Sequence, residues 1–253
     1  MKSRQFLTCQ WRDLVMLNYP VEPVLLRSLV PAGTRLDLFQ GVCYVSLVGF
    51  HYQQTRLMGM AIPFHRNFPE VNLRFYVVRE DAGEIRRGVV FIKEVVPLPA
   101  VAAVARWFFH EKFTSRPMKH EVRLPSAEQP GLAKYQWKHK GNWFQVQAEF
   151  EGESALAKAG SLEEFITEHY WGYTSRPDGS TLEYRVEHPS WQVWPKAEGS
   201  FTSAGEFYPD PWGEILQSPP ASCLVAAGSE ITVYRGGRIK NRLPLPRLEP
   251  ISH

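Results

Sequence analysis

The chain is poor in the features that mark several classes of protein. Its 253 residues include three cysteines, Cys9, Cys43 and Cys223, at wide spacing and without a Cys-x-x-Cys pair, so neither a disulfide framework nor a structural zinc site is indicated. Charges of opposite sign nearly cancel: 29 Lys and Arg residues against 26 Asp and Glu leave +3, which does not indicate a nucleic-acid partner. The longest apolar run, residues 95–109, contains two prolines and Arg106 and is shorter than the ~20 residues of a membrane-spanning helix.

A signal for export is also missing, because residues 1–8 are basic but contain no apolar stretch. We therefore expect a cytoplasmic protein with reduced thiols, with no cofactor or metal, and with neither nucleic acid nor a membrane among its partners. What the chain has in excess is aromatic side chains, since 8 Trp, 10 Tyr and 15 Phe make up 13% of the residues. That content predicts a large core, and it is also typical of protein interfaces.

Short strand-like segments separated by turns make up most of the sequence. Residues 35–39 and 42–51 meet at Gln40-Gly41, residues 71–79 and 85–96 flank a turn at 81–83, and residues 135–140 and 143–150 flank Gly141-Asn142. Further strands are expected at 181–186, 191–194, 223–227 and 231–235. Strands joined by such short turns favour antiparallel pairing.

Three segments are predicted to be helical. Residues 24–29 follow Pro23, which is tolerated in the first turn of a helix. Residues 100–110 are rich in alanine, with apolar side chains all round, and should be buried at one end of the fold. Ser161 and Glu164 form a capping box that begins a helix running to about residue 170. We predict an α+β fold, with one domain over residues 1–242 and a proline-rich tail over 243–253.

Polar and apolar side chains alternate over residues 70–77. Glu70, Asn72, Arg74 and Tyr76 share one face of this predicted strand, and the opposite face is apolar. Depending on the register of the following hairpin, either Glu94 or Lys93 joins the polar face. Two interpretations stay open: a solvated face with a cross-strand ion pair, or the polar wall of a pocket in which a buried arginine needs a carboxylate or an anionic ligand.

Other chemically interesting residues lie in predicted loops. His65, in the loop 63–69, is able to exchange protons near neutral pH, although most loop histidines are surface residues. Lys119 lies among other cations and would become nucleophilic if desolvated, whereas the spacing itself favours a charged cap on the preceding helix. The segments 168–173 and 187–191 lack the spacing of a zinc helix or a hydrolase motif, and are expected to be aromatic packing with a hydrogen-bonded imidazole.

Several motifs together resemble one bacterial family. They are Trp11-Arg12-Asp13-Leu14, Pro63-Phe64-His65-Arg66-Asn67-Phe68, Glu70-Val71-Asn72-Leu73-Arg74, Glu168-His169-Tyr170-Trp171-Gly172-Tyr173 and Tyr184-Arg185-Val186-Glu187-His188-Pro189. In this combination the chain resembles the YqjF-like proteins, a family of unknown function whose fold is grouped with the acetoacetate decarboxylase-like proteins. The resemblance implies a mainly antiparallel β-barrel with a few peripheral helices and an enclosed pocket.

The same resemblance implies positions for a site. Acetoacetate decarboxylase uses a Schiff-base lysine followed by a second lysine, with an arginine and glutamates around its pocket. Arg12 stands at the pocket arginine, Glu111 at a pocket glutamate and Lys119 at the second lysine. Met118 stands where the Schiff-base lysine would be, and Leu57 where a second glutamate would be. Because a thioether cannot form an imine, the resemblance carries the scaffold and not the decarboxylase mechanism.

Two hypotheses for function follow. The first is a pocket for an anionic or keto-acid-like ligand. In this hypothesis Arg12 and Arg74 hold the ligand, with Asn72, His65 and Tyr76 in the binding set. Glu70 or Glu111 serves as general base and Lys119 supplies positive charge, and whether a reaction is catalysed is left open. The second is a non-catalytic interaction or assembly module on the same fold, in which further copies of the chain would be the partners in a homo-oligomer.

Overall fold

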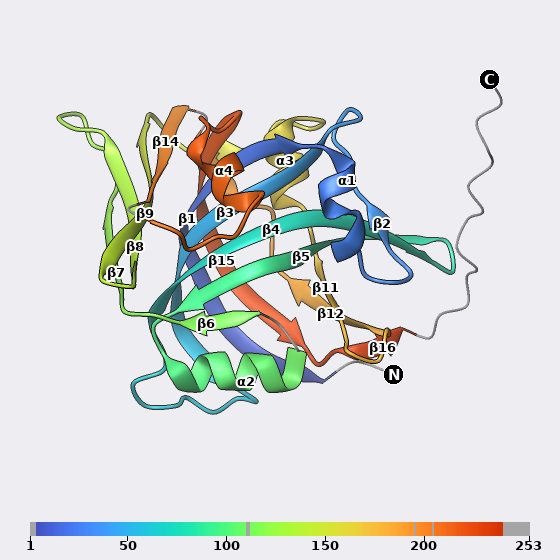
Figure 1. The fold of residues 1–253 in the computed structure, drawn as a ribbon. Coiled ribbons are helices and arrows are strands. Elements are labelled where there is room, and N and C mark those ends of the chain that lie inside the picture. The colour runs from blue at the N-terminus through green and yellow to red at the C-terminus, as the bar shows by residue number, and fades with distance from the viewer. Residues whose placement is uncertain (1–3, 110–111, 195, 204, 240–253) are drawn as a thin grey trace, which may run out of the picture.

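Strands account for most of the chain in the computed structural model, which describes residues 4–109, 112–194, 196–203 and 205–239 (Figure 1). The strands are β1 (Gln5–Val21), β2 (Arg35–Leu36), β3 (Cys43–Leu57), β4 (Phe68–Asp81), β5 (Glu84–Val96), β6 (Phe113–Ser115), β7 (Met118–Arg123), β8 (Gly131–His139), β9 (Asn142–Glu151), β10 (Ala155–Leu156), β11 (Trp171–Ser175), β12 (Thr181–Glu187), β13 (Gln192–Trp194), β14 (Lys196–Thr202), β15 (Ser222–Tyr234) and β16 (Gly237–Ile239). The helices are α1 (Pro23–Leu26), which continues as a 3-10 turn over Arg27–Leu29, α2 (Pro99–Phe109), α3 (Leu162–Thr167) and α4 (Trp212–Gln217). The tail predicted over 243–253 lies outside the described residues.

The larger sheet closes on itself as a ring. Its strands pair in the order β15-β1-β3-β4-β5-β11-β12, and β12 pairs again with β15 through Val186 and Val233. All of these pairings are antiparallel except that of β5 with β11, where Trp171 lies opposite Gly88. At that pairing a Cβ on Gly88 would lie 2.6 Å from the Trp171 carbonyl oxygen, so the approach of the two strands requires glycine. The predicted mainly antiparallel barrel with a few helices is confirmed.

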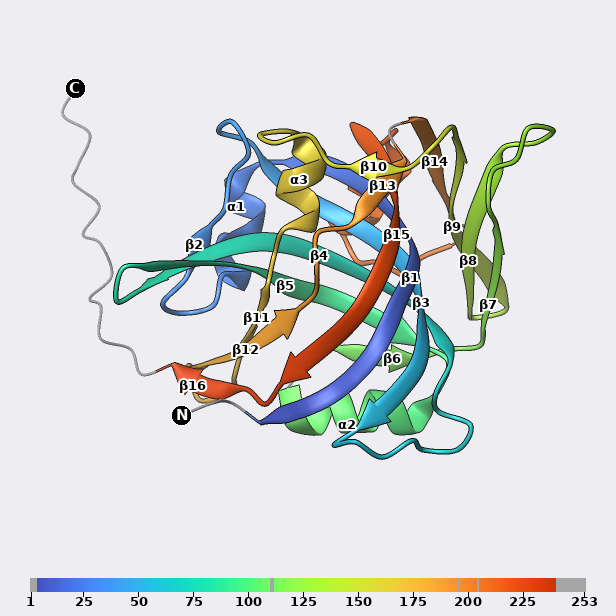
Figure 2. The ribbon, with the colours of Figure 1, turned by 180° about the vertical axis from the view of Figure 1, so that it is seen from behind.

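A second sheet packs against the outside of the ring. It has the order β14-β9-β8-β7 and stands beside β1, β3 and β4 (Figures 1 and 2). The two largest hydrophobic cores of the described residues lie between the sheets and inside the ring, and a smaller one lies at α2. In β4, Val71, Leu73 and Phe75 face the core between the sheets, while the even-numbered residues face the interior of the ring.

Helices cover the two open ends of the ring. Figures 1 and 2 show α2 across one end and α3 near the other. The predicted alanine-rich helix is confirmed as α2 over Pro99–Phe109, residue 110 lying outside the described residues, but only part of its surface is covered: Ala102 is fully buried, whereas Trp107 is 79% exposed. The Ser161 cap is also confirmed, since the hydroxyl oxygen accepts from the Glu164 N–H at 3.2 Å.

The sequence pattern misses some elements. β1, the long strand of the ring between β15 and β3, was not predicted, and neither were β14 and α4. The two strands expected at 223–227 and 231–235 are one continuous strand, β15. It passes through Gly228 at φ 75°, where a Cβ would lie 1.9 Å from the Trp11 carbonyl oxygen. That contact explains why this position is occupied by glycine inside a strand.

Candidate functional site

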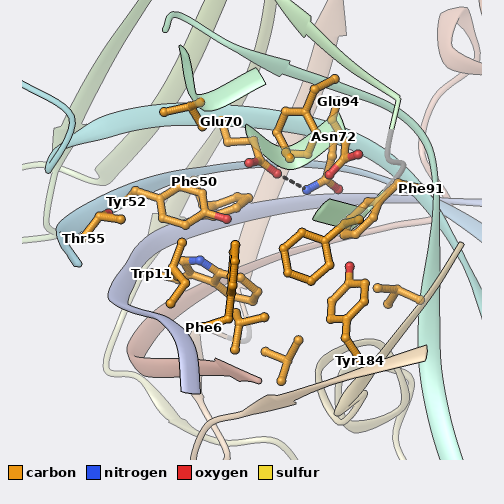
Figure 3. A pocket seen from close by; sticks show the side chains of 18 of the residues that line it. Phe6, Trp11, Phe50, Tyr52, Thr55, Glu70, Asn72, Phe91, Glu94 and Tyr184 are labelled. Carbon is orange, nitrogen blue, oxygen red and sulfur yellow. Dashed lines mark hydrogen bonds between the residues drawn. The ribbon is translucent and has the colours of Figure 1, made fainter. Parts of the chain in front are cut away.

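A cavity of about 250 Å³ lies inside the ring. Its walls are formed by β1, β3, β4, β5 and β12, and α2 and the loop 58–67 line the end of the ring that α2 covers. Most of the lining is apolar. Figure 3 shows Glu70, Asn72 and Glu94 together on one side, with the rings of Trp11 and Tyr184 on the other. The polar face predicted for residues 70–77 therefore belongs to a buried cavity and not to a solvated sheet.

A β-bulge decides which residue of β5 completes the polar wall. Near the turn, the register places Arg74 opposite Phe91. Continued unchanged, it would bring Lys93 opposite Asn72. One extra residue in β5 shifts the pairing, so that Asn72 lies opposite Glu94 instead. The bulge gives the cavity a second carboxyl group in place of an ammonium group.

Glu70 is an acid of this wall whose pKa is strongly perturbed. Its side chain is 2% exposed and accepts a hydrogen bond from the Asn72 amide at 2.9 Å. Burial raises the pKa of Glu70 to about 7, although the hydrogen bond from Asn72, the charge of Arg74 and a hydrogen bond from Tyr52 oppose the rise. At neutral pH this carboxyl group is poised between its protonated and ionised forms, as a general acid–base catalyst requires.

Arg74 is the one Lys or Arg residue in the described lining of the cavity. The residue is 7% exposed, and its Nη2 donates to the Ile166 carbonyl oxygen at 3.4 Å and contacts Met16 Sδ at 3.8 Å. Its Nε has no hydrogen-bond partner, and no carboxylate lies within 4.0 Å of the guanidinium, among the residues that the structure describes. A buried guanidinium without a contact ion pair is energetically unfavourable unless an anion reaches it.

An acid–imidazole pair borders the same wall. His169 Nε2 lies 3.3 Å from Asp37 Oδ2, and Arg87 Nε donates to the same oxygen at 2.7 Å. Burial lowers the pKa of His169 to about 4, although the hydrogen bond to Asp37 opposes this decrease. The imidazole is therefore neutral at neutral pH. Burial opposes ionisation of Asp37, but the hydrogen bonds from His169 and Arg87 lower the pKa of its carboxyl group overall. Nε2 therefore carries the proton, and Nδ1, for which no partner is found in the described chain, is a hydrogen-bond acceptor.

Further polar atoms of lining residues lack partners. Trp11 Nε1, Thr55 Oγ1 and Asn72 Oδ1 are buried and make no hydrogen bond within the part of the chain that the structure describes. Buried polar groups in proteins are almost always satisfied. Unsatisfied groups in the lining of one cavity are what a site for a polar ligand would contain.

The structure brings together four of the residues predicted for the site. Glu70, Asn72, Arg74 and His65 all line the cavity, His65 from the loop between β3 and β4. Tyr76 lies behind Arg74, whose Cζ is 5.6 Å from the centroid of its ring, and its hydroxyl group is hydrogen-bonded to Ser46 at 2.6 Å.

Two other predicted residues lie outside the cavity lining. Arg12 is outside the lining, half-buried, and pairs with Glu230 at 3.2 Å. Lys119 lies on exposed β7 in the second sheet, with its Nζ 4.4 Å from the centroid of the Trp143 ring. Its neighbour Met118 packs against the core between the sheets. Glu111 falls outside the described residues.

Sequence reasoning missed part of the lining. Thr55 and His188 line the cavity and were not predicted to do so. Leu57 also lines it, at the position where the resemblance places a second pocket glutamate. His188 stacks on Trp191 with 4.4 Å between ring centroids, so the expected aromatic packing of this segment is confirmed. One side chain can both pack against an aromatic ring and line a cavity. The absence of zinc-helix spacing in this segment therefore did not exclude His188 from the site.

The described residues show neither of two features that would point to another kind of site. No group of three or more His, Cys, Asp or Glu residues in this part of the chain is placed to hold a metal ion. None of its helices combines the length and apolar character that crossing a bilayer takes.

The closed ring, the second sheet and the central cavity together define an acetoacetate decarboxylase-like fold. The solved structures that share it include the following three, each at 14% identity. The enduracididine biosynthesis enzyme MppR complexed with pyruvate has a TM-score of 0.66, covering 94% of this chain and 91% of that one. For acetoacetate decarboxylase from Legionella pneumophila the TM-score is 0.64, with 94% and 89% covered. For an acetoacetate decarboxylase-like enzyme from Sphingomonas wittichii it is 0.63, with 93% and 94% covered.

At the level of sequence, the chain belongs to the DUF2071 family, described as "Uncharacterized conserved protein (COG2071)", whose model matches residues 8–229. It is also similar to the uncharacterized protein YqjF of Bacillus subtilis. The two are 28% identical over 180 residues, which cover 71% of this chain and 72% of YqjF.

Proposed function

We propose that this protein binds a small anionic, carbonyl-bearing compound of the 2-oxo acid type in the cavity of the barrel. The observation that carries the proposal is Arg74, a buried guanidinium on the cavity wall without a contact ion pair in the described chain. A ligand carboxylate would supply the missing anion, and a charge-assisted hydrogen bond in such surroundings is among the stronger polar interactions.

Glu70 is the group we assign to proton transfer. With a pKa of about 7 it donates a hydrogen bond to a ligand oxygen in its protonated form and accepts a proton in its ionised form. Asn72 holds one carboxyl oxygen at 2.9 Å and so fixes the direction of the other. In this scheme Asn72 is a positioning residue.

A Schiff-base mechanism is not part of the proposal. No lysine lines the cavity among the residues described, and Lys119 is in the second sheet. The chemistry we assign is general acid–base catalysis next to a bound carbonyl group, without a covalent intermediate.

Two comparisons support this class of ligand. The structurally similar enzyme MppR was solved in complex with pyruvate. It was also solved with the condensation product of pyruvate and imidazole 4-carboxaldehyde, in a structure with a TM-score of 0.65 at 13% identity that covers 92% of this chain and 88% of that one.

The test is the rise in melting temperature that 2-oxo acids produce in wild type, Arg74→Met and Arg12→Met. Methionine keeps much of the length of arginine but carries no charge. Arg74→Met is expected to weaken binding roughly ten- to a hundredfold, the range for losing a hydrogen bond to a charged group. Arg12→Met removes an arginine outside the cavity from the same barrel and should bind as wild type does. Absence of stabilisation by any 2-oxo acid, or equal binding by both variants, would overturn the proposal.

A further inference from the structure

The carboxyl and guanidinium groups of the described lining lie on one wall. β4 and β5 contribute Glu70, Asn72, Arg74 and Glu94, and His169 borders them. The rest of the lining comes from β1, β3, β12 and α2 and is mostly aromatic or aliphatic, as Figure 3 shows for Phe6 and Phe50. A ligand that fills this space needs a polar head toward β4 and an apolar body beyond it.

The volume is larger than a head group alone requires. A cavity of about 150 Å³ with an apolar lining is known to hold benzene, a molecule of six non-hydrogen atoms. In proportion, the 250 Å³ here would hold about ten. Pyruvate also has six non-hydrogen atoms, so it would leave room for about four more beside apolar side chains, where water finds few hydrogen-bond partners.

The apolar surface continues from the cavity to the outside. Ile62 lines the cavity and is 40% exposed, and Phe64, two residues further along the loop 58–67, is 94% exposed. On α2, Val104 and Ala105 line the cavity, while Trp107 is exposed. An apolar body would therefore meet apolar side chains on its way in as well as inside.

From the position of the carboxyl and guanidinium groups on one wall and from the excess volume, we infer that the natural ligand is an amphiphilic 2-oxo acid, with an apolar chain or ring about four carbon atoms larger than the methyl group of pyruvate. The inference rests on the proposed function, which assigns the 2-oxo acid head group of the ligand, and it adds that the rest of the ligand is apolar. Each methylene buried in the cavity should tighten binding about fourfold, which is the effect typical of a buried CH₂.

The experiment is a series of dissociation constants at one pH, by calorimetry, for pyruvate, 2-oxobutanoate, 2-oxopentanoate, 2-oxohexanoate, 2-oxoheptanoate and 2-oxooctanoate. We expect about fourfold tightening per carbon atom up to the six- or seven-carbon acid and no further gain beyond it. Ala105→Leu, which adds three carbon atoms on the cavity side of α2, should move this limit to shorter chains. Ala103→Leu, on the exposed face of the same helix, is the matched control and should follow the wild-type series.

The outcomes separate the two proposals. If no acid in the series binds, the proposed function fails. If pyruvate binds as tightly as the longer acids, or if Ala105→Leu leaves the limit where it was, the apolar body is refuted while the proposed function stands.

Discussion

Replacing Glu70 by Gln should stabilise the protein above pH 7 and change it little below pH 5. The folded state holds the carboxyl proton up to a pKa of about 7, whereas the unfolded chain releases it near the ordinary 4.5. Between these values the folded state binds more protons, so its stability falls as the pH rises from 4.5 to 7 and stays constant above that. The interval of about 2.5 pH units, at about 1.4 kcal/mol per unit, makes the loss about 3 kcal/mol.

The substitution suits this test because Gln removes the charge and keeps an oxygen that accepts from Asn72. Urea unfolding of wild type and Glu70→Gln would be compared at pH 5, 6, 7 and 8, so that titrations common to both proteins cancel. The variant's advantage should grow from under about 1 kcal/mol at pH 5 to about 3 kcal/mol at pH 8. Glu153→Gln, at an exposed position, controls for loss of a carboxylate. A difference that is the same at every pH, or a wild type that is more stable than Glu70→Gln at pH 8, would refute the assignment.

Two further predictions concern the seam of the ring and the second sheet. Gly88→Ala should lower the free energy of unfolding by about 1–3 kcal/mol, because the new Cβ would lie 2.6 Å from the Trp171 carbonyl oxygen. Gly237→Ala is the control, since a Cβ there has no atom within 4 Å. Equal urea midpoints for the two variants would contradict the prediction. Borohydride reduction in the presence of pyruvate should leave Lys119 unmodified, because its ammonium group lies over Trp143 outside the cavity. A pyruvate adduct on Lys119, detected by mass spectrometry, would contradict this position of the side chain.

The polar wall could be predicted from the sequence because β4 is buried on both faces with different partners. Its odd-numbered residues meet the second sheet and are apolar, and Glu70, Asn72 and Arg74 meet the cavity. The partner residue on β5 could not be predicted, because it depends on one bulge. That bulge turns Lys93 away, so that its Nζ donates to the Phe207 carbonyl oxygen at 2.6 Å.

β1 escaped prediction for a related reason. Residues 14–19 are buried on both faces, and residues 14–17 form a continuous apolar run without the alternation that marks a strand. Asp13, at φ 57°, also shifts the alternation by one residue within the strand. The pairing of His169 with Asp37 joins residues 132 apart in sequence, and no local pattern contains that information.

The two faces of β4 separate chemistry from stability. Val71, Leu73 and Phe75 hold the strand against the second sheet, and none of them reaches the cavity. The residues on the cavity side are therefore free to change over evolution without loss of the packing that keeps the ring closed. Members of one such family would share a barrel and differ in what they bind, and the even-numbered positions from 70 to 74 would be the place to find the difference.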